Sequence, residues 1–309
     1  MSKPRVLKIQ VPATSANVGV GFDCLGLALD MMATFSFVPS TDGQLHINGC
    51  EPRFCGADNL VWTSYCHTCS ELGIIEELLN ITIDSPIPLA GGLGSSSACI
   101  VAGIAAAYAL SGLSLDRERI IQMASSLEGH PDNVAPAVLG GLVCSFSNAG
   151  RVWTQRFDVA DRLRFVAIVP PYEVRTAAAR RVLPAEVPIT TAVWQTGRCV
   201  AMVRALETGN AELLAACAHD KLHEPYRARL IPDYEALRSA ALSSGASAFV
   251  ISGSGATMLA ICKNEQKAAG VRRTLATMES VSAAEGARRG LQIETLQACK
   301  TGLEILASS

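Results

Sequence analysis

A glycine- and serine-rich stretch in the first third of the chain has the composition of an anion-binding loop. Residues 88–98 read PLAGGLGSSSA and lie between an alternating stretch and a long apolar one. Glycines let a ligand approach the backbone closely, and the free N–H groups at the start of a helix attract negative charge. Ser95, Ser96 and Ser97 add hydroxyl groups that can donate hydrogen bonds or bind a metal ion. The stretch therefore predicts a phosphate-binding loop that opens a buried helix.

Two better-known glycine motifs do not fit these letters. The Walker A motif requires Gly-Lys-Ser/Thr, and the loop has no lysine. The dinucleotide fingerprint requires a third glycine where this chain has Ser97, and an acid at the end of a second strand, whereas Asp116 begins a predicted helix. For the motif alone, a turn into a buried helix without any ligand remains an alternative.

The spacing of apolar residues places this loop within a mixed pattern of strands and helices. In the first half, strands are predicted at residues 6–11, 25–38, 44–48, 79–84 and 140–147, and helices at 60–72, 98–110 and 116–128. In the second half, strands are predicted at 163–169, 248–252, 257–262 and 291–296, and helices at 190–206, 211–218 and 264–278. The pattern predicts two α+β lobes, residues 1–155 and 156–309.

Size and composition favour a globular protein with a small-molecule partner. The 309 residues suffice for two cores, and they are 49% hydrophobic and 17% charged with a net charge of −2. No segment concentrates lysine or arginine, so we expect no nucleic-acid partner and no anionic membrane surface. No apolar run reaches the roughly 18 to 20 residues of a membrane span, and residues 1–12 lack the features of a signal peptide. A cytoplasmic location is expected.

The eleven cysteines are scattered and odd in number, which predicts reduced thiols rather than a disulfide scaffold. Cys66 and Cys69 form a CxxC, but no second pair completes a zinc site, and the surrounding residues have helical spacing. We expect these two side chains to pack on a helix.

Three motifs in order resemble the signatures of the GHMP kinases, a family of small-molecule kinases. Residues 11–30 (VPATSANVGVGFDCLGLALD), 88–98 and 250–262 (VISGSGATMLAIC) resemble the first, second and third signatures. Residues 128–141 (EGHPDNVAPAVLGG), 180–184 (RRVLP) and 223–227 (HEPYR) are similar to segments of the branch that acts on homoserine. Val20 stands where the family usually has proline and Ser97 where it has alanine, and neither position requires a particular polar group.

The resemblance implies both a fold and a reaction. The fold would be two-lobed α+β, with an N-terminal ATP-binding lobe on a mixed sheet (ribosomal protein S5 domain 2-like) and a C-terminal ferredoxin-like lobe. The reaction would be ATP-dependent phosphorylation of L-homoserine to O-phospho-L-homoserine, a step in threonine synthesis. Another alcohol acceptor within the family, or a non-catalytic relative, remains an alternative. A homodimer is the commonest default for the assembly.

The resemblance also implies a nucleotide site with Mg²⁺. A loop serine, Ser95 or Ser96, and Glu128 would hold the metal ion beside the phosphates, since this cation prefers oxygen ligands. Asn59 matches a position near the nucleotide base, and a plain turn residue is the alternative there. The expected phosphate loop consists of Pro88, Leu89, Ala90, Gly91, Gly92, Leu93, Gly94, Ser95, Ser96, Ser97 and Ala98.

An acceptor such as homoserine carries an ammonium group, a carboxylate and a hydroxyl. Its pocket requires acid or amide oxygens, guanidinium groups, and alignment of the hydroxyl with the γ-phosphate. A substrate without an amine would not require an acid at Asp23. A structural role for His130, and Arg181 in place of Arg180, remain alternatives. The resemblance places the following residues around homoserine: Asn17, Asp23, His130, Asp132, Thr176, Arg180, Arg227 and Gly253.

No general base is evident for this reaction. Some members of the family resemble one another in using an aspartate with a lysine, but here Asn133 follows Asp132, and Thr14 and Ser15 in the first motif have no lysine beside them. We expect alignment and charge neutralisation by Mg²⁺, the helix dipole and Arg180 to drive catalysis, with the hydroxyl proton passing to the γ-phosphate or to solvent. Asp132 remains an alternative as the base.

Overall fold

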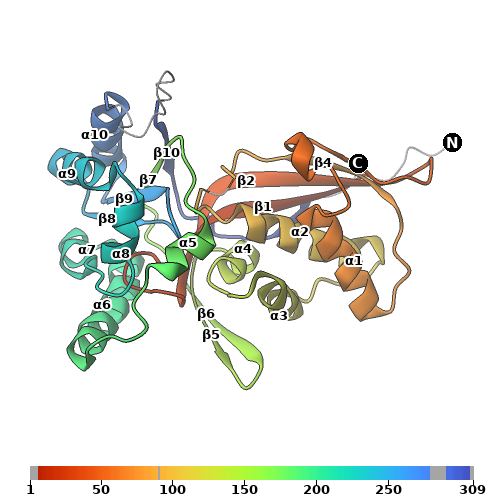
Figure 1. Ribbon diagram of the computed structural model, residues 1–309, viewed down its shortest axis with the longest axis horizontal. Coiled ribbons are helices and arrows are strands. Elements are labelled where there is room, and N and C mark those ends of the chain that lie inside the picture. Colours follow the sequence, from red (N-terminus) through yellow and green to blue (C-terminus); the bar gives the residue numbers. More distant parts are fainter. Residues whose placement is uncertain (1–5, 90, 279–289, 307–309) are drawn as a thin grey trace.

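The chain folds into two lobes, each made of α-helices packed on one β-sheet (Figure 1). The computed structural model describes residues 6–89, 91–278 and 290–306. Strands and helices occur in both lobes, which confirms the α+β class predicted from the sequence.

Seven strands form the sheet of the first lobe, in the order β11-β1-β2-β4-β3, with β5 beside β2 and β6 beside β5. β3 and β4 run parallel, whereas the other described pairs of this sheet are antiparallel, so the sheet is mixed as expected. The long strand β2 pairs with β4 at one end and with β5 at the other. The strands are β1 (Leu7–Ala16), β2 (Leu25–Pro39), β3 (His46–Asn48), β4 (Leu79–Asp84), β5 (Leu142–Asn148), β6 (Arg151–Phe157) and β11 (Glu304–Leu306).

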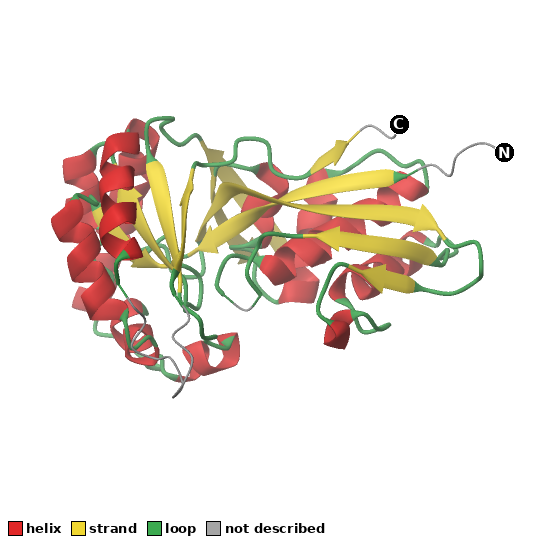
Figure 2. Cartoon of the chain, turned by 90° about the horizontal axis from the view of Figure 1, so that it is seen from above, coloured by secondary structure: helices red, strands yellow, loops and turns green. Residues whose placement is uncertain are grey.

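Helices cover one face of this sheet (Figure 2). They are α1 (Leu60–Leu72), α2 (Ser95–Leu110), α3 (Arg117–Glu128) and α4 (Val134–Leu139). Helix α2 contacts α1, α3 and β1 and is buried along most of its length, which explains why it is apolar all round. Gly103 lets α1 approach, because a Cβ there would lie 2.3 Å from Val61 O.

The second lobe is built on four antiparallel strands in the order β10-β7-β9-β8. These strands are β7 (Arg164–Val169), β8 (Ala248–Ile251), β9 (Met258–Cys262) and β10 (Gln292–Leu296). The helices are α5 (Thr176–Arg181), α6 (Ile189–Thr208), α7 (Ala211–Cys217), α8 (Glu224–Arg227), α9 (Tyr234–Ser244) and α10 (Glu265–Ala276). Helix α5 lies between the two lobes (Figure 1), where it can contribute to a site shared by both.

The two lobes share an apolar core, and the end of the chain returns from the second lobe to the first. One continuous core cluster includes Ile9 and Leu27 from the first sheet together with Phe165 and Leu259 from the second. Strand β11 returns the chain to the first sheet, where it pairs with β1. The domain boundary near residue 155 stays a prediction.

Most of the predicted elements agree with the structure, and several elements, most of them short, were not predicted. Helix α1 and strand β4 have the predicted bounds, whereas α2 begins three residues before the expected start at residue 98. Helices α4, α5, α8 and α9 and strands β6 and β11 were missed. The eleven cysteines are free, and Cys66 and Cys69 pack on α1 as expected. Among the described residues, no helix is long and apolar enough to cross a bilayer.

Candidate active site

The glycine loop is fixed to both lobes by hydrogen bonds to its carbonyl groups. On β1, the Thr14 N–H donates to Leu93 O at an N–O distance of 3.1 Å. From the turn between β8 and β9, the Thr257 N–H donates to Gly91 O at 3.0 Å, and Ser252 Oγ donates to Gly92 O at 2.6 Å. The loop is therefore held at the junction of the lobes.

Two glycines of the loop have no room for a side chain. Gly92 and Gly94 have φ angles of 84° and 71°, in the left-handed region that favours glycine. A Cβ on Gly94 would lie 2.0 Å from Thr14 Oγ1, and a Cβ on Gly92 would lie 2.3 Å from Ser252 O. Gly94 is the N-cap of α2, so this close approach places the start of the helix directly against β1.

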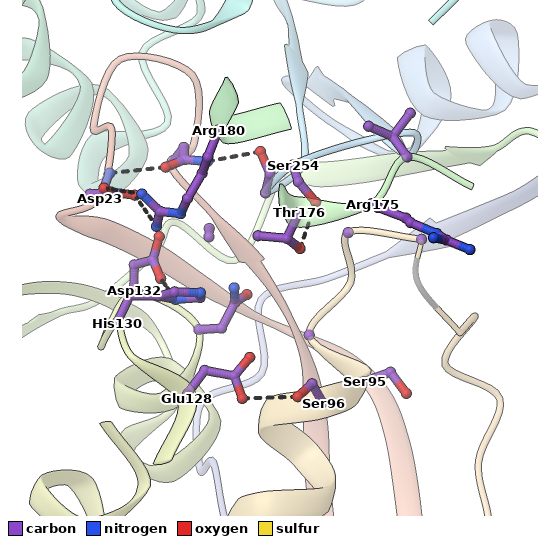
Figure 3. A pocket seen from close by; sticks show the side chains of 18 of the residues that line it. Asp23, Ser95, Ser96, Glu128, His130, Asp132, Arg175, Thr176, Arg180 and Ser254 are labelled. Atoms are coloured by element: carbon purple, nitrogen blue, oxygen red, sulfur yellow. Dashed lines mark hydrogen bonds and ion pairs between the residues drawn. The ribbon is translucent and has the colours of Figure 1, made fainter. Parts of the chain in front are cut away.

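The three serines of the loop form the first turn of α2, not the segment before it as predicted. Ser96 Oγ donates to Glu128 Oε2 at 2.9 Å (Figure 3). Ser97 is buried, and its Oγ has no hydrogen-bond partner among the described residues. The first N–H groups of a helix have no partners within the helix, so this turn presents a partial positive charge.

Glu128, the last residue of α3, supplies a carboxylate opposite that turn. Burial raises the pKa of Glu128, and the hydrogen bond from Ser96 lowers it by a smaller amount. The charged form is thus incompletely stabilised by the protein alone. A cation beside Glu128 and Ser96 would stabilise it.

The loop between α3 and α4 carries two further groups of the predicted site. His130 Nδ1 lies 2.7 Å from Asp132 Oδ1, and Asp132 is only 2% exposed. This hydrogen bond raises the pKa of His130, against the opposing effect of burial. Next to them, Thr14 Oγ1 donates to Asn133 Oδ1 at 2.8 Å, which ties the loop to β1.

The loop between β1 and β2 turns sharply around Asn17 and Asp23. Both residues have positive φ, at 69° and 55°, a conformation that asparagine and aspartate adopt more readily than other non-glycine residues. Asn17 Oδ1 accepts from the Asp23 N–H at 3.0 Å, and Asn17 Nδ2 donates to Gly253 O of the second lobe at 2.9 Å. Asn17 therefore fixes both the loop and its distance from the second lobe.

Arg180, on α5, forms a two-pronged ion pair with Asp23 across the lobes (Figure 3). Its Nη1 lies 3.0 Å from Asp23 Oδ2 and its Nη2 lies 3.1 Å from Asp23 Oδ1. Both side chains are partly exposed, at 41% and 38%. Arg180 lines the pocket, whereas its neighbour Arg181 does not, and Arg181 Nε donates to Ala177 O of its own helix.

These groups line one pocket of about 150 Å³ between the lobes. It brings together most of the predicted site: Asn17, Asp23, Gly91, Gly92, Gly94, Ser95, Ser96, Glu128, His130, Asp132, Asn133, Thr176, Arg180, Arg227 and Gly253. Arg227 is 3% exposed, and burial lowers its pKa. One end of the pocket is thus the start of α2, and the other is lined by acids and arginines.

Some predicted residues lie off this pocket. Asn59 caps α1, accepting from the Val61 N–H at 2.8 Å and donating to Phe54 O at 2.7 Å. The other residues that do not line the pocket are Pro88, Leu89, Leu93, Ser97 and Ala98, and Ala90 lies outside the described residues.

The pocket also contains residues that the sequence did not single out. Arg175 and Ser254 line it, and Ser254 Oγ lies 3.5 Å from Thr176 Oγ1 (Figure 3). Arg175 directly precedes α5, and Ser254 belongs to the third glycine motif. The position of Ser254 within that motif could have indicated it, whereas no pattern in the sequence distinguishes Arg175.

The arrangement suits transfer of a charged group between two small molecules. The start of α2 and the pocket arginines, Arg175, Arg180 and Arg227, would attract anions, whereas Asp23, Glu128 and Asp132 would attract cations. No cluster of three or more His, Cys, Asp or Glu side chains that could hold a metal ion occurs among the described residues. Any Mg²⁺ here would therefore depend on ligand oxygens from a bound phosphate.

Comparison with protein families identifies the class. The model of the GHMP kinases N terminal domain matches residues 59–141, and that of the GHMP kinases C terminal domain matches residues 202–279. The chain belongs to the GHMP kinase family. It is therefore a kinase, and ATP is its phosphate donor.

Within this family, individual relatives of the chain are homoserine kinases. The chain is 38% identical to a homoserine kinase of Clostridium beijerinckii over 83% of this chain and 86% of the relative. It is 40% identical to a homoserine kinase of Synechococcus over 88% of this chain and 90% of the relative. The crystal structure of homoserine kinase from Cytophaga hutchinsonii has a TM-score of 0.87 at 30% identity, covering 99% of both chains. A mevalonate kinase of Methanococcus jannaschii, at 14% identity and a TM-score of 0.71 over 96% of this chain and 99% of that one, shares the fold.

Proposed function

We propose that this protein phosphorylates the side-chain hydroxyl of L-homoserine with ATP, giving O-phospho-L-homoserine and ADP, a reaction of threonine synthesis. The observation that carries the proposal is the Asp23–Arg180 pair in the same pocket as the glycine loop. An amino acid presents an ammonium group and a carboxylate, which need an acid and a guanidinium group respectively. The names of the most similar relatives support the same acceptor.

The phosphates of ATP would bind at the start of α2, over Gly91 to Ser96. Glycines there permit close approach, and the helix dipole attracts negative charge. Ser95 or Ser96 and Glu128 would hold Mg²⁺, because this cation prefers oxygen ligands and the Ser96 hydroxyl lies beside the Glu128 carboxylate. Burial raises the pKa of Glu128, and a bound cation would stabilise its charged form. When bound, the metal ion would neutralise charge on the phosphates. The start of α1, which Asn59 caps, would border the base, so Asn59 would act there through the helix cap and not by direct contact.

On the acceptor side, Asp23 and Asn17 would bind the ammonium group, and Arg180 and Arg227 the carboxylate. His130, Asp132, Thr176 and Gly253 would complete the walls around the hydroxyl. The buried Asp132 holds the His130 ring through its hydrogen bond at 2.7 Å. The acceptor hydroxyl would then face the phosphate loop from the opposite side of the pocket.

Catalysis would depend on alignment and charge neutralisation rather than on a general base. The acceptor oxygen forms a bond to the γ-phosphorus, the bond to the β-phosphate oxygen breaks, and the hydroxyl proton passes to the transferred phosphate or to solvent. Arg180 would offset the developing negative charge. Asn133 would not act as a base, because a neutral carboxamide does not take up a proton near pH 7, and its Oδ1 accepts from Thr14 Oγ1. Loss of activity in Asp132→Asn with full activity in Asn133→Asp would instead identify Asp132 as a base.

A coupled assay of ADP release tests the acceptor. We expect activity with L-homoserine and little with mevalonate, galactose or shikimate at equal concentrations. Activity on a non-amino-acid alcohol alone would refute the proposal while leaving the kinase family intact. No activity on any alcohol, with intact ATP binding, would favour a non-catalytic relative.

A homodimer is proposed as the assembly, because two-fold dimers are the commonest oligomers. Size-exclusion chromatography with light scattering would distinguish a mass of one chain, 32.5 kDa, from twice that mass.

A further inference from the structure

Behind the acceptor end of the pocket lies a buried titratable side chain to which the proposed function gives no role. His223 directly precedes α8 and is fully buried. Its ring stacks on Phe22 of the β1–β2 loop, with ring centroids 5.2 Å apart. His223 therefore lies between the loop that carries Asp23 and the helix that carries Arg227.

The hydrogen bonds of the ring determine its tautomer. His223 Nε2 lies 2.6 Å from Gly19 O, and a carbonyl oxygen can only accept, so Nε2 carries a proton. His223 Nδ1 lies 3.4 Å from Arg227 Nη1, and a guanidinium nitrogen can only donate, so Nδ1 is unprotonated. Asp220 Oδ1, at 3.8 Å from Nε2, is too far away to compete.

The surroundings of His223 also favour the neutral form of its ring. Burial lowers the pKa of His223, and the nearby Arg227 lowers it further, whereas Asp220 opposes both. A second proton on Nδ1 would face the N–H groups of Arg227.

The guanidinium group of Arg227 makes three hydrogen bonds, one of which is to His223 Nδ1. Its Nε donates to Ala179 O at 3.3 Å, and its Nη1 donates to Gly253 O at 2.8 Å and to His223 Nδ1. Its Nη2 has no hydrogen-bond partner among the described residues, and Arg227 lines the pocket. Three contacts thus fix the planar guanidinium so that Nη2 remains for a ligand.

We propose that His223, as the neutral Nε2–H tautomer, is a positioning residue that aligns Arg227 with the β1–β2 loop carrying Asn17 and Asp23. One ring joins the carboxylate-binding and ammonium-binding sides of the acceptor site, since Nε2 holds the loop and Nδ1 holds the arginine. This inference rests on the proposed function for the identity of the acceptor. His223 itself does not line the pocket.

The surrounding polar groups support the same alignment. Asp220 Oδ2 accepts from the His223 N–H at 2.7 Å and from the Glu224 N–H at 2.8 Å, so it fixes the start of α8. Gln195 Nε2 donates to Asp220 Oδ1 at 2.6 Å and to Val20 O at 2.7 Å. Two neighbouring carbonyls of the β1–β2 loop, those of Gly19 and Val20, are therefore held by side chains of the second lobe.

Paired substitutions separate positioning from packing. His223→Leu keeps the approximate volume but removes both polar contacts, and His223→Gln keeps one donor and one acceptor. We expect His223→Leu to raise KM for homoserine about tenfold or more, with KM for ATP changed less than about twofold. His223→Gln should recover most of that loss. His219→Leu is the matched control, because this nearby side chain is exposed and only its backbone carbonyl accepts a hydrogen bond, from Trp194 Nε1.

In His223→Leu, equal rises in KM for both substrates, or no rise in either, would overturn the proposal. If the leucine variant does not fold, the glutamine variant decides, since near-wild-type KM values support the proposal and a loss as large for ATP as for homoserine refutes it. If the wild-type protein instead phosphorylates another alcohol, the proposed function fails. The change in KM for that alcohol is then compared with the change in KM for ATP in the same variants.

Nitrogen-15 NMR of the histidine rings gives a readout independent of activity. We expect one ring, absent from the spectrum of His223→Gln, to be neutral and protonated on Nε2 at pH 7. A ring protonated on Nδ1, or on both nitrogens, would overturn the proposal even if homoserine is the acceptor.

Discussion

Glu128 is the residue on which the proposed metal site depends. Its carboxylate lines the pocket and accepts a hydrogen bond from Ser96 in the first turn of α2. Glu128→Gln should lower kcat about 100-fold or more, because a charge that stabilises the transition state is lost. Titration of activity with Mg²⁺ measures this, with the exposed Glu118→Gln as the control. Unchanged kcat and Mg²⁺ dependence would remove Glu128 from the site.

Glu224 predicts a pH dependence of stability that is separate from catalysis. It is buried on α8, where its Oε1 accepts from the Ile251 N–H at 2.6 Å, and burial raises its pKa from 4.5 to about 8. Between pH 4.5 and about 8, Glu224 therefore keeps its proton in the folded state, whereas the unfolded chain has released it. This contribution to stability is complete below pH 4.5 and is lost as the pH rises through about 8.

The comparison of wild type with Glu224→Gln isolates that effect. Between pH 5 and pH 8, the free energy of unfolding of the wild type should fall relative to the variant, by at most about 1.4 kcal/mol per pH unit. Urea denaturation at pH 5, 6.5 and 8 measures the difference. A difference that stays constant over this range would show that Glu224 is charged throughout.

At the scale of residues, the sequence predicted those pocket residues that belong to recognisable motifs. Asp23, Arg180 and Arg227 belong to the recognised segments, and the structure brings them together. The role proposed for His223 could not be predicted, because its contact with Gly19 joins residues 204 positions apart. A pairing of that kind depends on how the lobes pack and leaves no periodic signal in the chain.

At the scale of elements, helix α1 offers a test of Asn59. Both the amide nitrogen and the amide oxygen of this side chain form hydrogen bonds with backbone groups near the start of α1. Asn59→Ala should lower the free energy of unfolding by about 1 kcal/mol or more, and KM for ATP should change less than about threefold. Asn210→Ala, which removes the cap of α7 away from the pocket, is the matched control. A large rise in KM for ATP in Asn59→Ala alone would support a direct role at the base.

Element length explains why three of the helices were missed, but not why the 11-residue α9 and the seven-residue β6 were. Helix α1 and strand β4 have enough residues for their periodicity to determine both ends. Helices α4, α5 and α8 have six, six and four residues, so each shows less than two turns of any pattern. The start of α2 was placed too late because serines commonly precede a helix, whereas here the left-handed Gly94 is the cap.

At the scale of the whole molecule, the shared core predicts cooperative unfolding. The core cluster spans both lobes, and β11 ties the end of the chain to β1. Differential scanning calorimetry should show one transition. A ligand at about 100 times its Kd should raise Tm by roughly 4 °C, and this should hold for a nonhydrolysable ATP analogue and for homoserine. Two transitions, of which each ligand shifts one, would show that the lobes unfold independently.

The ion pair between Asp23 and Arg180 has a consequence for selectivity before any chemistry occurs. In the absence of a ligand, each of these groups satisfies the other. A ligand with only one charge must separate them and leave one partner unsatisfied, so it gains little. A zwitterion replaces both contacts at once and restores the balance of charge. If the acceptor binds as proposed, the ion pair would therefore make the free pocket select zwitterions over molecules with a single charge.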